Sequence, residues 1–289
     1  MDWVERDCAP FFIRFDNGEC KLIYGISIRA FDTPPFNTIS ESLEQLSLGD
    51  DESLFETPPP MPDCPICFLP LPIEDDAYKN KICCGKTICI GCIEAHFRTV
   101  GVEKSCPFCR APDFHSNRET IRLMKKRVEL NDPEVTFCLG CYYESNSIGL
   151  PKDLQKAHEL FVRAADLGSP RACTNAYGVF DKGEVFERDE AKARYYLEKG
   201  AKLGQVKARH NLGIMAAQKE EWDLAHRHWK ISASSGYQPS LDGLKHSYKR
   251  GMLCKEELTD CLRAQQKTLS EAWSKDRAYA TANNDSEYL

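Results

Sequence analysis

The sequence has no run of about eighteen apolar residues, the length that a helix needs to cross a bilayer, so insertion into a membrane is not expected. Met1 to Pro10 lack a basic region followed by an apolar core, so a secretory signal is not expected either. Basic residues are not in excess: 38 Lys and Arg stand against 44 Asp and Glu, and the net charge of -6 argues against binding to the phosphate backbone of nucleic acids. Cysteine, by contrast, is frequent, with 15 in 289 residues. Without a secretory signal these are expected to be reduced thiols, which predicts a cytoplasmic or nuclear protein.

Eight of the cysteines are grouped between residues 64 and 109. They form four pairs, which are Cys64 and Cys67, Cys83 and Cys84, Cys89 and Cys92, and Cys106 and Cys109. Two thiolates separated by two residues can bind one metal ion through a tight turn, and two such pairs complete a tetrahedral zinc site. The spacing therefore predicts two structural zinc ions, against the alternative of cysteines scattered through a core. A further pair, Cys138 and Cys141, has no second pair near it and is interpreted as core packing.

Residues 64–110 resemble the RING finger family. The resemblance rests on Cys64-x-x-Cys67, Cys84-Gly85, Cys89-x-x-Cys92 and Cys106-Pro107-x-Cys109-Arg110. In that family the two zinc ions are cross-braced, so that the first and third pairs bind one ion and the second and fourth pairs bind the other. Carried over, this implies a first site of Cys64, Cys67, Cys89 and Cys92, and a second site of Cys83, Cys84, Cys106 and Cys109.

One position departs from the commonest RING pattern, in which a histidine two residues after the cysteine is a ligand. Lys86 stands there, and a protonated ammonium has no lone pair for zinc. The resemblance to all-cysteine RING variants makes the preceding Cys83 the natural replacement, with His96 as the alternative fourth ligand. Adjacent side chains of an extended strand point to opposite faces, so Cys83 and Cys84 need a local turn, which Gly85 can permit.

The resemblance also implies an activity. RING fingers bind a ubiquitin-conjugating enzyme charged with ubiquitin and hold the thioester ready for attack by a substrate lysine, without a covalent intermediate on the RING. The family's contact positions correspond here to Ile66 in the first cysteine pair, Pro107 and Phe108 in the last, and His96 with Phe97 where the family often has a tryptophan. Arg110 matches the family's linchpin arginine, whose guanidinium can bridge the conjugating enzyme and ubiquitin.

The second half of the chain contains a repeat. Gly168, Gly204 and Gly236 lie 36 and 32 residues apart, and an alanine precedes each of them by eleven positions. Small and large residues recur at helical spacing before each glycine, which is typical of helix pairs stacked as an α-solenoid. The first repeat, with Leu139-Gly140-x-x-Tyr143, Lys156-Ala157 and Ala164-Ala165-x-x-Gly168, resembles the Sel-1-like family, a relative of the tetratricopeptide repeat. The resemblance covers about residues 133–273 and implies a surface for protein partners.

The N-terminal residues 1–63 are expected to be a leader and linker, largely disordered, because their second half is rich in Pro, Ser, Asp and Glu. Two β-prone runs within 11–28 flank a turn sequence and predict a hairpin. Apolar residues at helical spacing in 39–48 are compatible with a short docking helix, although a disordered linker with chance spacing is the favoured interpretation.

Two other segments connect and end the chain. Residues 117–131 predict a connecting helix, which a capping box at Ser116 begins. The basic run at 125–127 is interpreted as a solvated face of this helix, with a nuclear localisation signal as the alternative. Residues 274–289 are polar and are expected to be a frayed tail.

We therefore expect a small zinc-stabilised α+β RING domain followed by an all-α solenoid of helix-turn-helix repeats. The two resemblances imply a RING-type ubiquitin ligase, with a charged ubiquitin-conjugating enzyme on the RING and a substrate or adaptor on the repeats. The alternative is a non-catalytic zinc-binding scaffold. Ile66, Pro107 and Arg110 favour the ligase, whereas His96 favours the scaffold. A zinc finger that binds nucleic acid is disfavoured, because the chain is acidic and has no helix rich in Arg or Lys that could contact bases.

Overall fold

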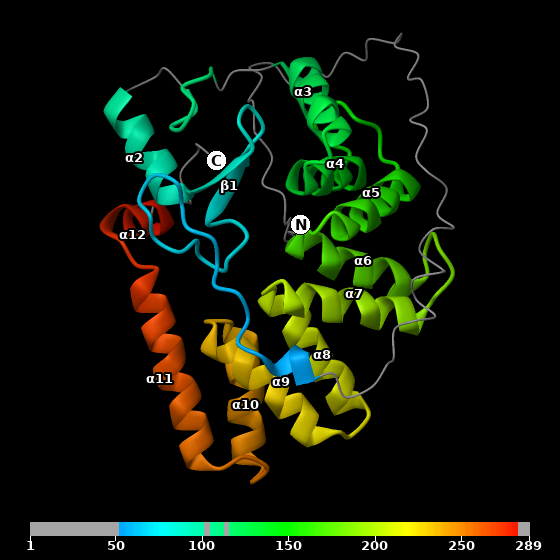
Figure 1. Ribbon diagram of the computed structural model, residues 1–289, viewed down its shortest axis with the longest axis vertical. Coiled ribbons are helices and arrows are strands. Elements are labelled where there is room, and N and C mark those ends of the chain that lie inside the picture. Colours follow the sequence, from blue (N-terminus) through cyan, green and yellow to red (C-terminus); the bar gives the residue numbers. More distant parts are fainter. Residues whose placement is uncertain (1–51, 101–104, 113–115, 283–289) are drawn as a thin grey trace.

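The computed structural model describes residues 52–100, 105–112 and 116–282. The hairpin expected at 11–28 and the helix considered at 39–48 lie outside these residues. The described chain passes through a small module with two strands and then forms a long series of helices, whose end returns to the module (Figure 1). No helix in the described ranges has both the length and the apolar character that crossing a bilayer requires.

The module with the strands consists of one hairpin and one helix. Strand β1 (Tyr78–Lys81) pairs antiparallel with β2 (Lys86–Cys89), and helix α2 (Ile90–Val100) follows β2 without a loop. Ile88 and Ile93 lie in its small core, exposed by 0% and 4%. This is the α+β domain that the sequence predicts.

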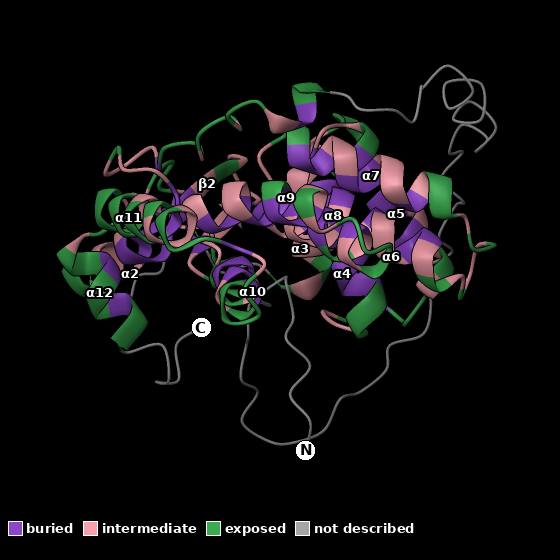
Figure 2. Ribbon diagram, turned by 90° about the horizontal axis from the view of Figure 1, so that it is seen from below, coloured by how far each residue is buried: buried purple, intermediate pink, exposed green. Residues whose placement is uncertain are grey.

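The rest of the described chain is a stack of helices. They are α3 (Asn117–Glu129), α4 (Pro133–Ser145), α5 (Leu154–Asp166), α6 (Pro170–Lys182), α7 (Glu190–Lys202), α8 (Val206–Gln218), α9 (Trp222–Ser234), α10 (Gln238–Lys249), α11 (Lys255–Glu271) and α12 (Lys275–Ala282). From α4 to α9 they pack as the pairs α4 with α5, α6 with α7 and α8 with α9, and each pair contacts the next. Figure 2 shows buried residues gathered where these helices meet. The predicted all-α solenoid is confirmed.

Capping residues set the helix boundaries in the repeats. Asp153 begins α5 and Asp189 begins α7, each by accepting a hydrogen bond of 2.9 Å from the amide three residues further on. The glycines that mark the repeat follow α5, α7 and α9, and all have positive φ: Gly168 at 96°, Gly204 at 85° and Gly236 at 107°. The C-terminal glycines that define the sequence period therefore terminate the second helix of each pair.

Helix α3 is the connecting helix expected at 117–131. Ser116 caps it, as the capping box predicts, by accepting a hydrogen bond of 3.2 Å from the backbone amide of the third helical residue. The interpretation of 125–127 as a solvated face is wrong for Arg127, whose Nε donates to the carbonyl oxygen of Ile82 at 2.8 Å. Arg127 thereby links the connecting helix to the turn between β1 and β2.

The segment expected to be a polar, frayed tail contains α12, which packs against α2. Arg277 and Ala280, three residues apart on one face of α12, are exposed by only 7% and 3%. Two buried positions in eight residues are too few to produce a recognisable hydrophobic period, so the sequence did not predict this helix.

The described end of the expected linker also contacts the repeats. A 3-10 helix, η2 (Glu52–Phe55), packs Leu54 among residues of α7 and α8. Arg209 of α8 donates to the carbonyl oxygen of Leu54. Residues 52–55 are therefore held by the solenoid, in contrast to the disordered linker that their composition predicts.

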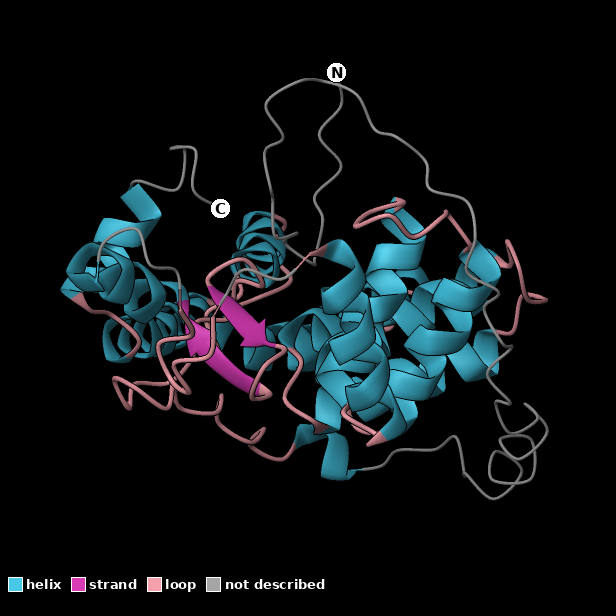
Figure 3. Cartoon of the chain, turned by 90° about the horizontal axis from the view of Figure 1, so that it is seen from above, coloured by secondary structure: helices cyan, strands magenta, loops and turns pink. Residues whose placement is uncertain are grey.

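The strand module lies between the main stack and the C-terminal helices, as Figure 3 shows for β1 and β2. Asp75, in the loop before β1, fixes the module to the stack. Its carboxylate lies 3.3 Å from Arg171 of α6, pairs with Lys207 of α8, and accepts from the Tyr78 hydroxyl at 3.1 Å. Because Arg171 and Asp75 are each only 11% exposed, this is a largely desolvated ion pair, which has little freedom to separate.

Candidate metal centre

The first and third cysteine pairs come together in one cluster. The sulfur atoms of Cys64, Cys67, Cys89 and Cys92 all lie within 4.8 Å of one another. Cys64 Sγ lies 3.9 Å from Cys92 Sγ, and Cys67 Sγ lies 3.8 Å from Cys89 Sγ. Two of these residues come from the loop before β1, and two from the end of β2 and the first turn of α2.

The second and fourth pairs form a second cluster of Cys83, Cys84, Cys106 and Cys109. Cys84 Sγ lies 3.9 Å from Cys106 Sγ, and Cys109 Sγ lies 3.4 Å from Cys83 Sγ. Adjacent cysteines reach the same cluster because residues 82–85 form a turn, in which Gly85 has a φ of 68° and its amide donates to the carbonyl oxygen of Lys81 at 2.6 Å. This is the local turn that the sequence predicts.

One backbone loop occurs twice, once in each cluster. In the first, the Cys64 amide donates to the Leu69 carbonyl oxygen and the Phe68 amide to the Cys64 carbonyl oxygen, both at 2.9 Å. In the second, the Cys106 amide donates to the Ala111 carbonyl oxygen at 2.8 Å, and the Arg110 amide to the Cys106 carbonyl oxygen at 2.9 Å. The residue after the second cysteine has positive φ in both loops, 56° at Phe68 and 60° at Arg110. We call these loops the first knuckle (residues 64–69) and the second knuckle (residues 106–111).

His96, the alternative fourth ligand, is outside both clusters. Its Nε2 lies 3.0 Å from the hydroxyl oxygen of Ser105. Lys86, at the position of the usual histidine ligand, places its Nζ 5.8 Å from the centre of the Phe108 ring. The geometry thus places Cys83, and neither His96 nor Lys86, in the second cluster.

The donor sets fit zinc. Four thiolates at about 2.3 Å from a tetrahedral zinc ion lie about 3.8 Å apart. Three of the sulfur separations given above, 3.8 to 3.9 Å, are close to this value, and the fourth, between Cys83 and Cys109, is shorter at 3.4 Å. Burial raises the pKa of the thiols of Cys83, Cys84 and Cys92, so these sulfur atoms need a cation to be stable as thiolates. Four thiolates leave no open coordination position, which makes each cluster suited to a structural ion.

The residues at the family's contact positions lie on the two knuckles and on α2. Phe108 is 44% exposed and Arg110 is also exposed, whereas Pro107 is half-buried. An apolar residue that contacts a partner from a zinc knuckle is expected to be exposed, but Ile66 is not. It is half-buried and packs partly against the core of the module, as does Phe97.

The sequence did not point to three residues around these clusters. Phe68, with a side chain 74% exposed, occupies in the first knuckle the place that Arg110 has in the second. Asp75 and Arg277 join the module to the helices. The repetition of Cys-Pro-x-Cys in both knuckles could have identified Phe68, whereas no local pattern marks a single acidic or basic residue as a contact between segments distant in sequence.

Comparison with known proteins gives a result for each part of the chain. The Sel1 repeat family matches residues 139–169 and 175–205. A candidate RING finger protein of Acanthamoeba polyphaga mimivirus, R311, is 36% identical to this chain over 50 residues. These residues are 17% of this chain and only 6% of the viral protein.

Two solved structures are similar to part of this chain. A Sel1 repeat protein from Oxalobacter formigenes gives a TM-score of 0.46 at 23% identity, over 55% of this chain and 67% of its own. The antigen c5321, present in uropathogenic Escherichia coli strains and displaying an SLR fold, gives 0.45 at 18% identity, over 66% of this chain and 39% of its own. From the matched repeats and the two four-cysteine clusters, we conclude that the chain contains a cysteine module similar to a RING finger, followed in the sequence by Sel1 repeats.

Proposed function

We propose that this protein is a RING-type ubiquitin ligase in which the two cysteine clusters each hold one structural zinc ion. The observation that carries the proposal is the cross-braced order of the clusters, with the first and third pairs in one and the second and fourth pairs in the other. The weak similarity to the viral protein named as a RING finger supports the same assignment.

Bound zinc would hold the two knuckles rigidly, and the knuckles carry the residues for a ubiquitin-conjugating enzyme. The side chain of Ile66 offers apolar surface on the first knuckle, and those of Pro107 and Phe108 on the second. Closed tetrathiolate sites offer no metal-bound water, so the contribution of the module to the reaction is to bind and orient the charged enzyme.

Arg110 has the most direct part in the proposed reaction. It is exposed, it follows the last cysteine, and its backbone is fixed by the bond from its amide to the Cys106 carbonyl oxygen. A guanidinium has five donors in one plane, so it can bind carbonyl oxygens of the conjugating enzyme and of ubiquitin together. The Sel1 repeats would bind the substrate or an adaptor. We also propose a location in the cytoplasm or nucleus, where thiols stay reduced.

The test is single-turnover discharge of ubiquitin from a panel of charged conjugating enzymes onto free lysine, with binding measured separately. The protein is expected to accelerate discharge with at least one enzyme. Ile66→Ala should weaken binding by about 1–3 kcal/mol if Ile66 is an interface anchor. Arg110→Ala should leave binding nearly unchanged and slow discharge, because its interactions matter mainly in the reactive arrangement. Arg118→Ala, at an exposed arginine on α3, is the matched control and should change neither.

A zinc-binding scaffold without ligase activity is the second candidate, and His96 at the position of the family's frequent tryptophan is the observation that favours it. A scaffold would bind zinc and fold normally but would not accelerate discharge with any enzyme of a broad panel. That result would reject the ligase and retain the metal sites.

A further inference from the structure

Arg277 of α12 connects the last described helix of the chain to the first knuckle. Its Nη1 donates to the carbonyl oxygens of Pro70 at 2.7 Å and of Ala272 at 2.6 Å. Its Nη2 donates to the sulfur of Cys67 at 3.4 Å and to the carbonyl oxygen of Leu69 at 3.3 Å. One guanidinium thus binds a sulfur atom of the first cluster, the carbonyl oxygen of Leu69 at the end of the first knuckle, and that of Pro70 directly after it.

The hydrogen bonds of Arg277 lie at the point where the backbone loop of the first knuckle closes. The Leu69 carbonyl oxygen that accepts from Arg277 also accepts from the Cys64 amide, the bond that closes the loop. Because the side chain of Arg277 is only 7% exposed, water competes little for its donors. Hydrogen bonds from a charged donor are about twice as strong as those between neutral groups, so this contact is well placed to hold the loop.

The approach of α12 to α2 is close enough to require a glycine. A Cβ atom at Gly91 would lie 2.7 Å from the backbone nitrogen of Arg277 and 2.9 Å from its Cα. On the rim, Arg98 of α2 pairs with Asp276 at 2.6 Å and stacks 4.3 Å from the centre of the Tyr279 ring. The contacts between α12 and α2 therefore fix the position of Arg277 next to the first knuckle.

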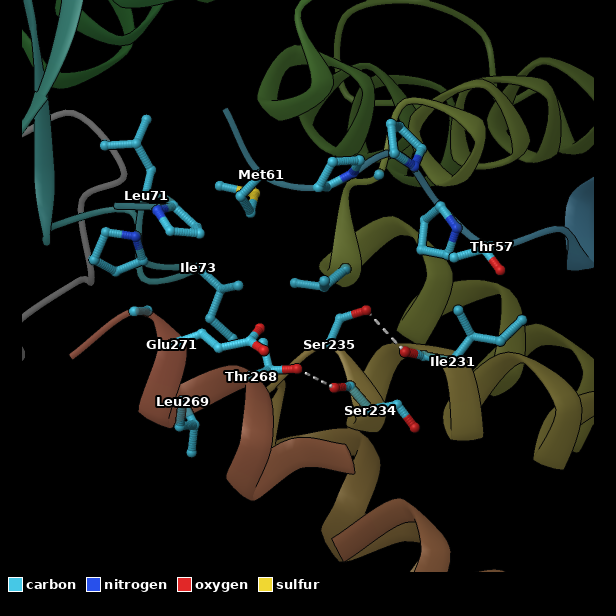
Figure 4. Close-up of a pocket in the computed structure, with 18 of the residues that line it drawn as sticks. Thr57, Met61, Leu71, Ile73, Ile231, Ser234, Ser235, Thr268, Leu269 and Glu271 are labelled. Carbon is cyan, nitrogen blue, oxygen red and sulfur yellow. Dashed lines mark hydrogen bonds between the residues drawn. The ribbon is translucent and has the colours of Figure 1, made fainter. Parts of the chain in front are cut away.

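The neighbouring junction contains a cavity. Between the loop after the first knuckle and helices α9 and α11 lies a cavity of about 540 Å³, with Met61, Leu71 and Ile73 on its walls (Figure 4). Two of its hydroxyls donate to helix carbonyl oxygens: Ser235 Oγ donates to that of Ile231 at 3.0 Å, and Thr268 Oγ to that of Ser234 at 2.9 Å. An open space loses dispersion contacts, so the position of the loop depends more on its polar contacts.

We propose that Arg277 is a positioning residue for the first metal cluster: its guanidinium donates to the Cys67 ligand and holds the first knuckle in the shape that retains zinc. The inference rests on the proposed zinc occupancy of that cluster. Partners of this kind around a metal ligand orient the ligand and stabilise the bound ion. The C-terminal helix would then set how firmly the first site, and with it Ile66, is held.

The test uses pulsed alkylation of the full chain in its zinc-loaded form, with mass spectrometry to measure the rate at each cysteine. Loss of such a partner typically costs about 10- to 100-fold in metal affinity, so Arg277→Gln should speed modification of the four cysteines of the first cluster by about tenfold or more. The four cysteines of the second cluster should keep their rates. Arg263→Gln, which breaks an exposed pair with Asp260 on α11, is the matched control and should resemble the parent protein.

Two further measurements separate positioning from loss of folding. Arg277→Lys keeps the charge but has one donor nitrogen, so its effect should lie between those of the parent and Arg277→Gln. In NMR spectra of protein loaded with ¹¹³Cd, the resonance of the first site should shift in both variants, and the resonance of the second site should not. Far-UV circular dichroism should show that the repeats stay folded.

The outcomes distinguish this inference from the proposed function. If Arg277→Gln leaves the first cluster as protected as in the parent protein, or exposes both clusters equally, the inference is wrong. If the parent protein contains no zinc and all eight cysteines react alike, the proposed metal sites are wrong. In that case hydrogen exchange of the Cys64 and Leu71 amides still measures whether Arg277 holds the knuckle, and unchanged exchange in Arg277→Gln would overturn that as well.

Discussion

At the scale of single residues, Cys83 decides the composition of the second cluster. It lies 3.4 Å from Cys109 Sγ, whereas His96 makes its contact with Ser105. Cys83→Ser should therefore release about one zinc ion per chain and loosen residues 83–109, while His96→Ala should keep the parent's metal content. Zinc measured by elemental analysis on reduced protein checks this. Release of zinc by His96→Ala, with retention in Cys83→Ser, would identify His96 as the ligand.

Two glycines in the first helices of the repeats should respond in opposite ways to substitution by alanine. A Cβ atom at Gly140 would lie 2.7 Å from Cε1 of the buried Phe161, whereas one at Gly178 meets no atom within 4 Å. Gly140→Ala should destabilise the repeats by about 1–3 kcal/mol, because the core has no room for the methyl group. Gly178→Ala should stabilise them by up to about 1 kcal/mol, because alanine favours the helix.

Urea denaturation followed by circular dichroism measures both glycine variants against the parent protein. The pair is informative because both glycines follow a large apolar or aromatic residue in the first helix of a repeat, yet Gly140 is buried and Gly178 is only half-buried. Destabilisation by Gly178→Ala would mean that the packing around α6 differs from the structure described here.

At the scale of elements, α9 carries a buried histidine that should make the repeats sensitive to acid. Burial, together with the positive charges of Arg209, Arg227 and Arg194, lowers the pKa of His228 to about 4. In the unfolded chain its pKa is about 6.5. Between these pH values the unfolded chain binds a proton at His228 that the folded chain excludes. The free energy of unfolding therefore has its full value above about pH 6.5 and decreases as the pH falls toward 4.

From the difference of the two pKa values, His228 is expected to lower the free energy of unfolding by about 2 kcal/mol between pH 7 and pH 5. His228→Leu removes the titration and keeps an apolar side chain beside Phe55, whose ring lies 4.9 Å from that of His228. The urea midpoint of the variant should therefore fall less between pH 7 and pH 5 than that of the parent. An equal fall in both proteins would exclude His228 as the cause.

The sequence predicts elements where the determinants are local. The capping box at Ser116 predicts a helix start and Gly168 predicts a helix end, so the sequence predicted both the connecting helix and the solenoid. The cysteine spacing likewise predicts both clusters, with the cross-braced order coming from the family resemblance. The short elements η2 and α12 were missed, because each depends on a few contacts with residues about 150 or more positions away, such as Leu54 with Arg209. Such contacts leave no period in the sequence.

At the scale of the whole molecule, the cysteine module and the repeats have separate cores but share a junction. Asp75 joins the module to α6, Arg277 of α12 binds the loop after the first knuckle, and Arg127 of α3 adds a bond to the β1–β2 turn. Their polar contacts define the direction in which the knuckles face relative to the repeats. If the proposed function holds, that direction determines which lysines of a bound substrate come within reach of the conjugating enzyme.

The central claim is that each chain holds two structural zinc ions, and native mass spectrometry of freshly purified, reduced protein tests it most directly. We predict a mass increase of two zinc ions. After removal by a strong chelator, hydrogen exchange should become fast in residues 63–112 and in α12, which is too short to remain helical without its contact to α2, while α4 to α10 stay protected. A protein that carries one zinc ion or none, and whose cysteine module is equally protected with and without the chelator, would contradict the account.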